Sequence, residues 1–399
     1  KGCVSMLTMG IDIGKNSHFF AGVDGATGEI VIRPTCFKND TSGFDFLIDQ
    51  INRLPVKPDL IGMEDTGHYH LNLLQFLLQK NFKVALINPT STDMARKMQG
   101  SITKNDKTDT LLICDMLLSS SRKKPYRIIQ LEDDELTEAK YLTRHHHDLK
   151  EERNTYTNKL QQCIDRVFPE FNSLFKSKYG IVYMRILKTF ASASNIAHAN
   201  IRSLRQCFAA QKKGRPISLT PEQLKEAARK SVGTHSDAMV LKIKHLIARI
   251  ELVDEQLSEI DKKIEEFSEK INSPILSIPG ISHFSGTSII AELGNIGKYS
   301  KPSKIIKFAG VAPKEYESSE YKAQHTAISK KGSKYLRKTL YQVIFPVIQN
   351  NPVFKAYYNL KISQGKGHLC ALGHCVRKLM RVIYHLLSTG TYFDPDLLR

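Results

Sequence analysis

Apolar and polar positions along the first 120 residues switch between the patterns of strands and of helices. Strands are predicted at "SMLTMGIDIGK", "SHFFAGVD" and "GEIVIRP", and a helix at "TSGFDFLIDQINRL". They are followed by strand "DLIGME", helix "HLNLLQFLLQK", strand "KVALIN" and a helical region that ends in "TDTLLICDMLLSSS". Three consecutive strands followed by alternating helices and strands indicate an α/β domain with a mixed sheet, of the RNase H-like type.

The middle of the chain has the most regular apolar pattern. Nine apolar residues from Ile243 to Ile271 are spaced alternately three and four positions apart. This heptad spacing is typical of a coiled coil. A shorter stripe from Leu149 to Val167 matches it, which predicts a long helical hairpin or a dimerising coil. His145, His146 and His147 lie on this segment; three consecutive side chains fan around a helix, so they cannot share a metal ion and are expected at the surface.

The last part of the chain opens with "SPILSIPGISHFSGTSIIAELGNIGKYSKPSKIIKFAGVAP". Pro279 and Gly280 interrupt the helical pattern, as the turn of a helix-hairpin-helix element does. Such a turn aims backbone N–H groups at a phosphate without contacting the bases. The predicted organisation is an α/β catalytic domain over residues 1–125, a helical coiled-coil region over 126–272, and a mostly α-helical domain over 273–399.

The charge of the chain is strongly positive. Its 58 Lys+Arg against 40 Asp+Glu give a net charge of +18, which favours a polyanionic partner such as nucleic acid. From Tyr321 to Phe393 there is no Asp or Glu, while twelve Lys or Arg are interleaved with tyrosines, a pattern that favours phosphate contact.

Other function classes are disfavoured by composition and pattern. No apolar run reaches the roughly 20 residues that a membrane span needs, so no membrane partner is expected. The seven scattered cysteines have no CxxC spacing, which argues against a disulfide framework and a zinc ribbon. The chain shows no signal-peptide pattern, so a cytoplasmic location is expected.

Four carboxylates lie where the predicted elements would bring them together. Asp12 interrupts the apolar first strand in "GIDIGK", and Glu64 ends the later strand in "IGMEDTGHYH". Asp106 and Asp109 share one face of a helix, where they repel each other unless a cation lies between them. In an RNase H-like sheet these four groups would converge and hold two Mg²⁺ ions, which prefer oxygen ligands. Asp65, His68 and His70 are nearby alternatives, and Lys15 is a candidate phosphate contact.

The same residues resemble a known family. "GIDIGK", "MEDTGHY" and "TKNDKTD" resemble the motifs of the DEDD transposases of insertion-sequence elements, which include the Piv-type DNA invertases and the bridge-RNA-guided recombinases. The stretch from "IPGI" through "ISKKGSKYLR" is similar to the C-terminal transposase domain of that family. The resemblance covers roughly residues 1–120 and 273–385, and the central coiled coil also fits.

The resemblance implies a RuvC-like domain whose acids correspond to Asp12, Glu64, Asp106 and Asp109. They would bind Mg²⁺, two ions per site, with Mn²⁺ able to substitute. It also implies a catalytic serine that attacks DNA and becomes covalently joined to it. The family's serine precedes a glycine, whereas "YESSEYK" has Ser318 and Ser319 followed by Glu320. Alignment on the downstream "ISKKG" favours Ser319, and the missing glycine leaves a choice between the two serines.

The implied partners are donor and target DNA, a structured bridge RNA, and further copies of the chain in a dimer or tetramer. The implied setting is the nucleoid of a bacterial or archaeal cell. The residues themselves agree with a divided site, because a serine hydroxyl needs a base or a metal for activation. The cations of "SKKGSKYLR" would neutralise the phosphate charge, and they are Lys330, Lys331, Lys334 and Arg337.

Three other kinds of protein share features of this sequence. A non-catalytic RNA- or DNA-binding scaffold with a RuvC-like fold would share the basic surface and the coiled coil. A resolvase-like, Mg²⁺-dependent nuclease would use water in place of the serine. A sugar or acetate kinase shares the sheet type and a "DIGK"-like strand end, but a second Asp-Gly-rich phosphate motif is not evident in the sequence.

Overall fold

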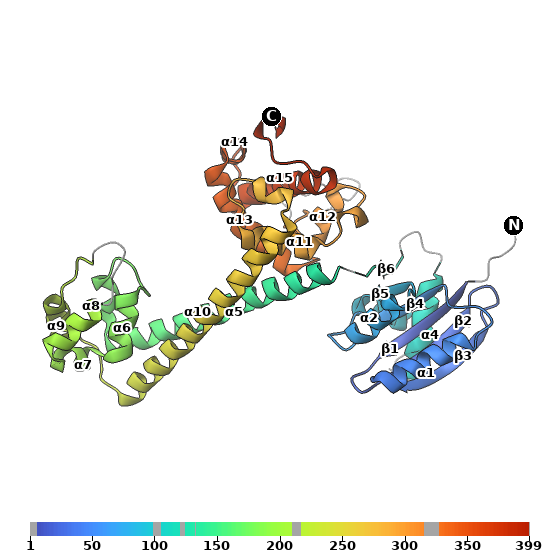
Figure 1. The fold of residues 1–399 in the computed structure, drawn as a ribbon, viewed down its shortest axis with the longest axis horizontal. Coiled ribbons are helices and arrows are strands. Elements are labelled where there is room, and N and C mark those ends of the chain that lie inside the picture. Colours follow the sequence, from blue (N-terminus) through green and yellow to red (C-terminus); the bar gives the residue numbers. More distant parts are fainter. Residues whose placement is uncertain are drawn as a thin grey trace. The chain divides into compact units, whose positions relative to one another are not determined.

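The structure is a computed structural model that describes residues 6–98, 105–119, 124–131, 133–209, 217–314 and 327–398. The chain divides into two compact units, Lys1–Glu132 and Asp133–Arg399, and Figure 1 shows their elements. Nothing in the structure tests the three-domain division, which stays a prediction. Within the described ranges, no helix combines the length and the apolar character needed to cross a bilayer.

The first unit is a six-stranded mixed sheet with helices. Its elements are β1 (Leu7–Ile13), β2 (Ser17–Asp24), β3 (Ile30–Lys38), α1 (Thr41–Asn52), β4 (Leu60–Glu64), α2 (Leu71–Gln79), β5 (Val84–Ile87), α3 (Pro89–Met98), α4 (Asp106–Leu118) and β6 (Tyr126–Ile129). The strand order is β3-β2-β1-β4-β5-β6. β1 pairs antiparallel with β2 and parallel with β4. The predicted mixed sheet is confirmed, whereas β6 was not anticipated from the sequence.

The two faces of the sheet are covered differently. Met9 and Ile11 of β1, with Ile61 and Met63 of β4, pack in one core with residues of α1 and α2. The opposite face is covered by α4, which lies very close to the strands.

Glycines allow this close approach of α4. A Cβ atom on Gly10 would lie 2.2 Å from the carbonyl oxygen of Thr110, and one on Gly62 would lie 2.8 Å from Leu117 Cδ1. Larger residues at Gly10 or Gly62 would therefore push α4 off the sheet.

The second unit is helical. Its elements are α5 (Asp134–Val167), η1 (Pro169–Leu174), α6 (Ile181–Thr189), α7 (Ala193–His198), α8 (Ile201–Phe208), α9 (Pro221–Arg229), α10 (Asp237–Ile271), η2 (Pro274–Ser277), α11 (His283–Leu293), η3 (Ile296–Lys298), α12 (Pro302–Phe308), α13 (Lys334–Asn350), α14 (Pro352–Ser363), α15 (His368–Thr389) and η4 (Pro395–Leu398). Helices α6–α9 gather at one end of the long helices, and α11–α15 gather at the other (Figure 1).

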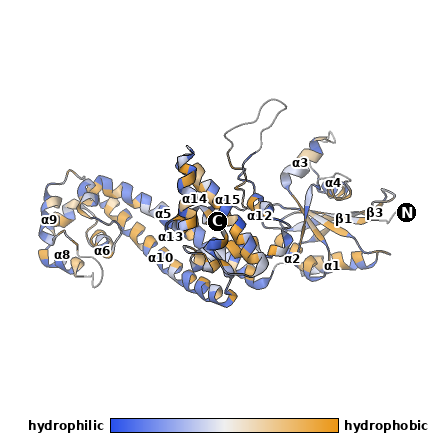
Figure 2. Cartoon of the chain, turned by 90° about the horizontal axis from the view of Figure 1, so that it is seen from above, coloured by the Kyte–Doolittle hydropathy of each residue, from blue (hydrophilic) through white to orange (hydrophobic). Residues whose placement is uncertain are grey.

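The long helices α5 and α10 lie side by side and run antiparallel. Arg153 Nη2 donates to Asp254 Oδ2 at 3.0 Å, and Lys270 pairs with Glu135. Apolar and polar positions alternate along both helices in Figure 2. The heptad positions from Ile243 to Ile264 are buried within the chain. The predicted seam is therefore used inside one chain, and a dimerising coiled coil stays a prediction.

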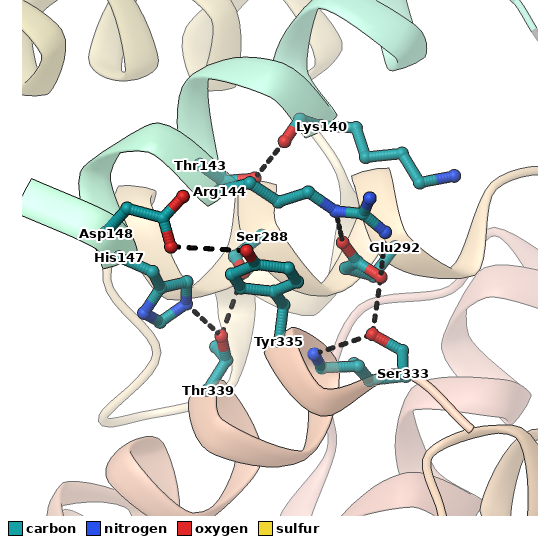
Figure 3. Close-up of polar contacts among 11 residues, drawn as sticks. Lys140, Thr143, Arg144, His147, Asp148, Ser288, Glu292, Ser333, Tyr335 and Thr339 are labelled. Carbon is teal, nitrogen blue, oxygen red and sulfur yellow. Dashed lines mark hydrogen bonds and ion pairs between the residues drawn. The ribbon is translucent and has the colours of Figure 1, made fainter. Parts of the chain in front are cut away.

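The expected surface position of the three histidines is wrong for two of them. His145 is exposed, but His146 is 5% exposed and His147 is 2% exposed. Their side of α5 is covered by α11, because the Phe284 ring lies 4.0 Å from His146 and 5.2 Å from His147 between centroids. His147 Nε2 also lies 2.9 Å from Thr339 Oγ1 of α13 (Figure 3). The pattern of α5 alone did not show these tertiary neighbours.

The buried histidines predict an acid-sensitive unit. Burial, aided by nearby positive Lys338, lowers the pKa of His147 from its usual 6.5 to about 4. As the pH falls, His147 is therefore protonated in the unfolded chain before it is protonated in the folded chain. The contribution of neutral His147 to the free energy of unfolding is complete above pH 6.5. As the pH falls from 6.5 towards 4, this free energy decreases by up to about 3 kcal/mol.

Urea unfolding between pH 4.5 and pH 7.5 checks this expectation. The urea midpoint of the wild type should fall with pH, and His147→Asn should reduce that dependence. His145→Gln is the matched control, because His145 is exposed on the same helix. Equal pH dependence in both variants would contradict a role for the buried imidazole.

Candidate active site

Asp12 and Glu64 lie on neighbouring strands. In the parallel β1–β4 pair, Gly10 lies opposite Gly62 and Ile11 lies opposite Met63, so the next residues along are Asp12 and Glu64. Side chains alternate between the faces of a strand, which places both carboxylates on the face of Gly10 and Gly62. Neighbouring strands are about 4.8 Å apart. Residues 52 positions apart in sequence are thereby brought side by side.

Helix α4 carries the other two predicted acids across this same face. The helix begins at Asp106, and the Asn105 side chain caps it by accepting a hydrogen bond from Lys107 N–H at 3.1 Å. The contact between Thr110 and Gly10 fixes the first turns of α4 over β1. Asp109 is buried there, whereas Asp106 is exposed one turn earlier.

Helix α3 contributes two polar residues that sequence reasoning missed. Thr92 Oγ1 donates to Glu64 Oε1 at 2.7 Å. Arg96 Nε donates to Asp109 Oδ1 at 3.1 Å, and Arg96 Nη2 lies 3.1 Å from Asp109 Oδ2. Thr92 and Arg96 are four residues apart and so share a helix face. That spacing was the available signal, but it did not reveal which acids the face would meet.

The donor set fits a hard divalent cation. The four predicted acids would supply the oxygen ligands that Mg²⁺ prefers, although Asp106 is exposed and, in the ranges that the structure describes, no contact joins it to the other three. Within the part of the chain that is described, the buried Asp109 Oδ2 receives no hydrogen bond, although the Arg96 guanidinium lies beside it. A buried carboxylate oxygen favours an additional cationic partner. Among the described residues, no three His, Cys, Asp or Glu side chains are grouped closely enough to hold a metal ion.

The alternative ligands have other partners. Asp65 Oδ2 accepts a hydrogen bond from Arg127 Nη2 at 2.9 Å, and Asp65 Oδ1 lies 3.6 Å from His70 Nε2. His68 packs against the ring of Tyr69, with 4.3 Å between centroids. These contacts link β4 to β6 and to the start of α2, and they give Asp65 a structural role.

Ser318 and Ser319 lie outside the described residues. The residues on either side of them are described and pair with each other. Lys314 N–H donates to the Ala327 carbonyl at 2.9 Å, and Ser329 N–H donates to the Ala312 carbonyl at 2.8 Å. We call residues 312–314 and 327–329 the neck. The described residues on either side of the candidate nucleophiles are therefore joined by backbone hydrogen bonds.

A buried polar cluster lies close to the end of the neck. Ser333 Oγ donates to Glu292 Oε2 at 2.6 Å, and Arg144 Nε donates to Glu292 Oε1 at 2.6 Å (Figure 3). Glu292 is only 1% exposed, so its charge requires these partners. The cluster joins α5, α11 and the start of α13. Its sequence signal was an acid in the apolar segment "TSIIAEL", which we did not single out.

The predicted phosphate-binding residues have varied surroundings. Arg337 Nη1 donates to the carbonyl oxygens of Ala309 and Lys330, at 3.3 and 3.2 Å, so this guanidinium supports the loop beside the neck. Lys334 Nζ lies 4.8 Å from the centre of the Tyr335 ring. Lys15, Lys330 and Lys331 are exposed. Phosphate contact by any of these residues stays a prediction.

Gly280 has a packing reason for its identity. Its φ is +98°, and a Cβ atom there would lie 2.6 Å from the Pro346 carbonyl carbon of α13. The residues before the turn form the short 3₁₀ helix η2, so the structure does not confirm a helix-hairpin-helix element. A phosphate contact at Gly280 is likewise untested.

Comparison with known proteins gives matches over both parts of the chain. A family model named DEDD_Tnp_IS110 and described as "Transposase" matches residues 9–169, and the model "Transposase IS116/IS110/IS902 family" matches residues 272–359. The chain is 20% identical to the "Insertion element IS110 uncharacterized 43.6 kDa protein" of Streptomyces coelicolor, over 98% of this chain and 96% of that protein.

Two further matches cover smaller parts of the chain. The chain is 21% identical to the "Pilin gene-inverting protein" of Moraxella bovis, over 39% of this chain and 48% of that protein. Among solved structures, "T. thermophilus RuvC in complex with Holliday junction substrate" matches 31% of this chain and 99% of its own, with 13% identity and a TM-score of 0.23.

Proposed function

The chain belongs to the IS110-type DEDD transposase family of insertion-sequence elements, and on this premise we propose that it is a bridge-RNA-guided DNA recombinase that exchanges strands through a covalent phosphoserine intermediate. Its site would combine a Mg²⁺-dependent RuvC-like centre, Asp12, Glu64, Asp106 and Asp109, with Ser319 as nucleophile. The observation that carries the proposal is the side-by-side placement of Asp12 and Glu64 under the first turns of α4.

The sheet supports an RNase H-like assignment of the first unit. β1 lies between antiparallel β2 and parallel β4, and α4 crosses the face that carries the acids. The antiparallel meander β1–β3, continued by the parallel strands β4 and β5, agrees with the mixed sheet predicted for this fold. The family match over residues 9–169 supports the same assignment.

The proposed chemistry divides the work between the two units. The Ser319 oxygen attacks the scissile phosphorus and the bond to the departing sugar oxygen breaks, so the serine proton must leave and the departing oxygen must gain one. The carboxylates would hold the cation, and a carboxylate would accept the serine proton. Bound Mg²⁺ would supply the positive charge that offsets the phosphate oxygens. The ester stays in the enzyme–DNA link, so a free strand end can attack it and release the serine.

The charge of the chain supports nucleic-acid partners. A net charge of +18 and an acid-free span of 73 residues suit binding to donor DNA, target DNA and a structured guide RNA. We further propose a dimer or tetramer that acts at the nucleoid, in the cytoplasm of a bacterial or archaeal cell.

Strand exchange by purified protein tests the proposal. Donor and target plasmids are incubated with the protein and its co-purified RNA, and joined products are sequenced across the junction. Joined products are expected with Mg²⁺ or Mn²⁺, and none with EDTA or after ribonuclease treatment. Cleavage without joining would favour a water-using nuclease, and binding without either would favour a non-catalytic scaffold.

A further inference from the structure

We propose that Arg96 is a positioning residue that competes with a divalent cation for Asp109. Its guanidinium holds the buried carboxylate in the metal-free protein and is displaced when the cation binds. This inference rests on the proposed function of the four acids, and it adds a role for α3, which that function does not assign.

The contact between Arg96 and Asp109 is an ion pair in which the guanidinium occupies the position beside the carboxylate that a cation would take. Arg96 reaches Asp109 with two nitrogens, Nε at 3.1 Å from Oδ1 and Nη2 at 3.1 Å from Oδ2. The side chains are 16% and 7% exposed, so water screens the pair weakly. A cation that binds Asp109 there would meet the guanidinium at close range. Two positive centres beside one carboxylate repel each other, so the more strongly bound one displaces the other.

Arg96 has a second carboxylate within reach. Asp93 Oδ1 lies 3.6 Å from Arg96 Nη1, one turn earlier on α3. Asp93 is about half exposed and also pairs with Lys97 at 2.9 Å. A displaced guanidinium can therefore move towards Asp93 and water and stay paired.

The same face of α3 also contacts Glu64. Thr92 is buried, and its hydroxyl donates to Glu64 Oε1 at 2.7 Å. Thr92 and Arg96 thus hold one acid from β4 and one from α4 in position before a cation arrives. Leaving the buried Asp109 carboxylate without a cationic partner would be costly. Arg96 therefore holds the Asp109 carboxylate in its orientation at the expense of metal affinity.

Calorimetric titration of the full chain with Mg²⁺ and with Mn²⁺ tests the inference. Arg96→Gln should bind the cation roughly tenfold more tightly than wild type, because one competing charge is removed. Lys97→Gln is the matched control: it removes one positive charge from the neighbouring, exposed position and should leave affinity close to wild type. Arg96→Lys should fall between wild type and Arg96→Gln, because it keeps the charge but loses the two-nitrogen contact.

Thermal unfolding provides the second readout. Without metal, Arg96→Gln should melt below wild type, and Mg²⁺ should raise its Tm by more than it raises that of wild type. If Arg96→Gln does not fold, the intermediate affinity of Arg96→Lys still decides. Equal or weaker cation binding by the Arg96 variants overturns the competition while leaving the acidic site standing. Absence of cation binding in wild type as well overturns both this inference and the proposed metal site.

Discussion

Glu64→Gln is expected to lower the rate of strand exchange roughly 10²–10³-fold or more. The loss of one anionic ligand weakens the charge stabilisation that the acidic centre supplies. The substitution is nearly isosteric, and the glutamine carbonyl can still accept the hydrogen bond that Thr92 donates at 2.7 Å. The fold should therefore persist, with an unchanged circular dichroism spectrum. Joined DNA is quantified by sequencing or by gel.

The adjacent carboxylate provides the control. Asp65→Asn removes a charge one residue away, yet Asp65 is engaged with Arg127 and His70, outside the proposed set. It should keep most activity. An active Glu64→Gln together with an inactive Asp65→Asn would show that the four-acid assignment is wrong at this position. The affinity for the divalent cation should likewise be reduced in Glu64→Gln and close to that of the wild type in Asp65→Asn.

Ser319→Ala is expected to eliminate the covalent protein–DNA adduct and to reduce joined product to background, a loss of more than about a thousandfold. Suicide substrates, which prevent resealing, should trap an adduct that survives denaturation of the wild type. Mass spectrometry of the trapped peptide identifies the modified serine. Ser319→Ala should still bind RNA and DNA, because one hydroxyl contributes little to binding of a polyanion.

Ser318→Ala is the matched control and should retain the adduct, because alignment on the downstream "ISKKG" favours Ser319 as the nucleophile. DNA on Ser318 would move the nucleophile by one residue, as the departure from the family's serine–glycine pattern allows. Cleaved DNA without any adduct would identify water as the nucleophile.

The two units differ in how much could be predicted. In the first unit, period-two and helical patterns predicted the strands through β5 and the helices α1, α2 and α4, because the sheet buries regular apolar positions. The four-residue strand β6 was missed, since so short a segment carries little pattern. In the second unit, the heptad positions were predicted, but their partner was not, because heptad spacing fits a helix of the same chain or of another.

The candidate site was predicted only in part, because some of its residues stand out in the sequence and others do not. Asp12 stands out because a carboxylate in an apolar strand is costly unless it has a partner. Arg96 and Thr92 do not stand out, because their helix carries ordinary polar residues. Their importance comes from contacts with β4 and α4, which are distant in sequence. The burial of His146 and His147 was missed likewise, since it depends on Phe284 and α11.

The sequence by itself determined the alternation of strands and helices in the first unit, the positive charge, and the acids that stand against their apolar or helical surroundings. These are local properties, set by the periodicity of side chains and by the cost of an unpaired charge. Only the tertiary structure decided that Asp12 adjoins Glu64, that Arg96 pairs with Asp109, and which helix covers the heptad seam. Strand register and helix packing arise from contacts between distant segments, which local patterns do not specify.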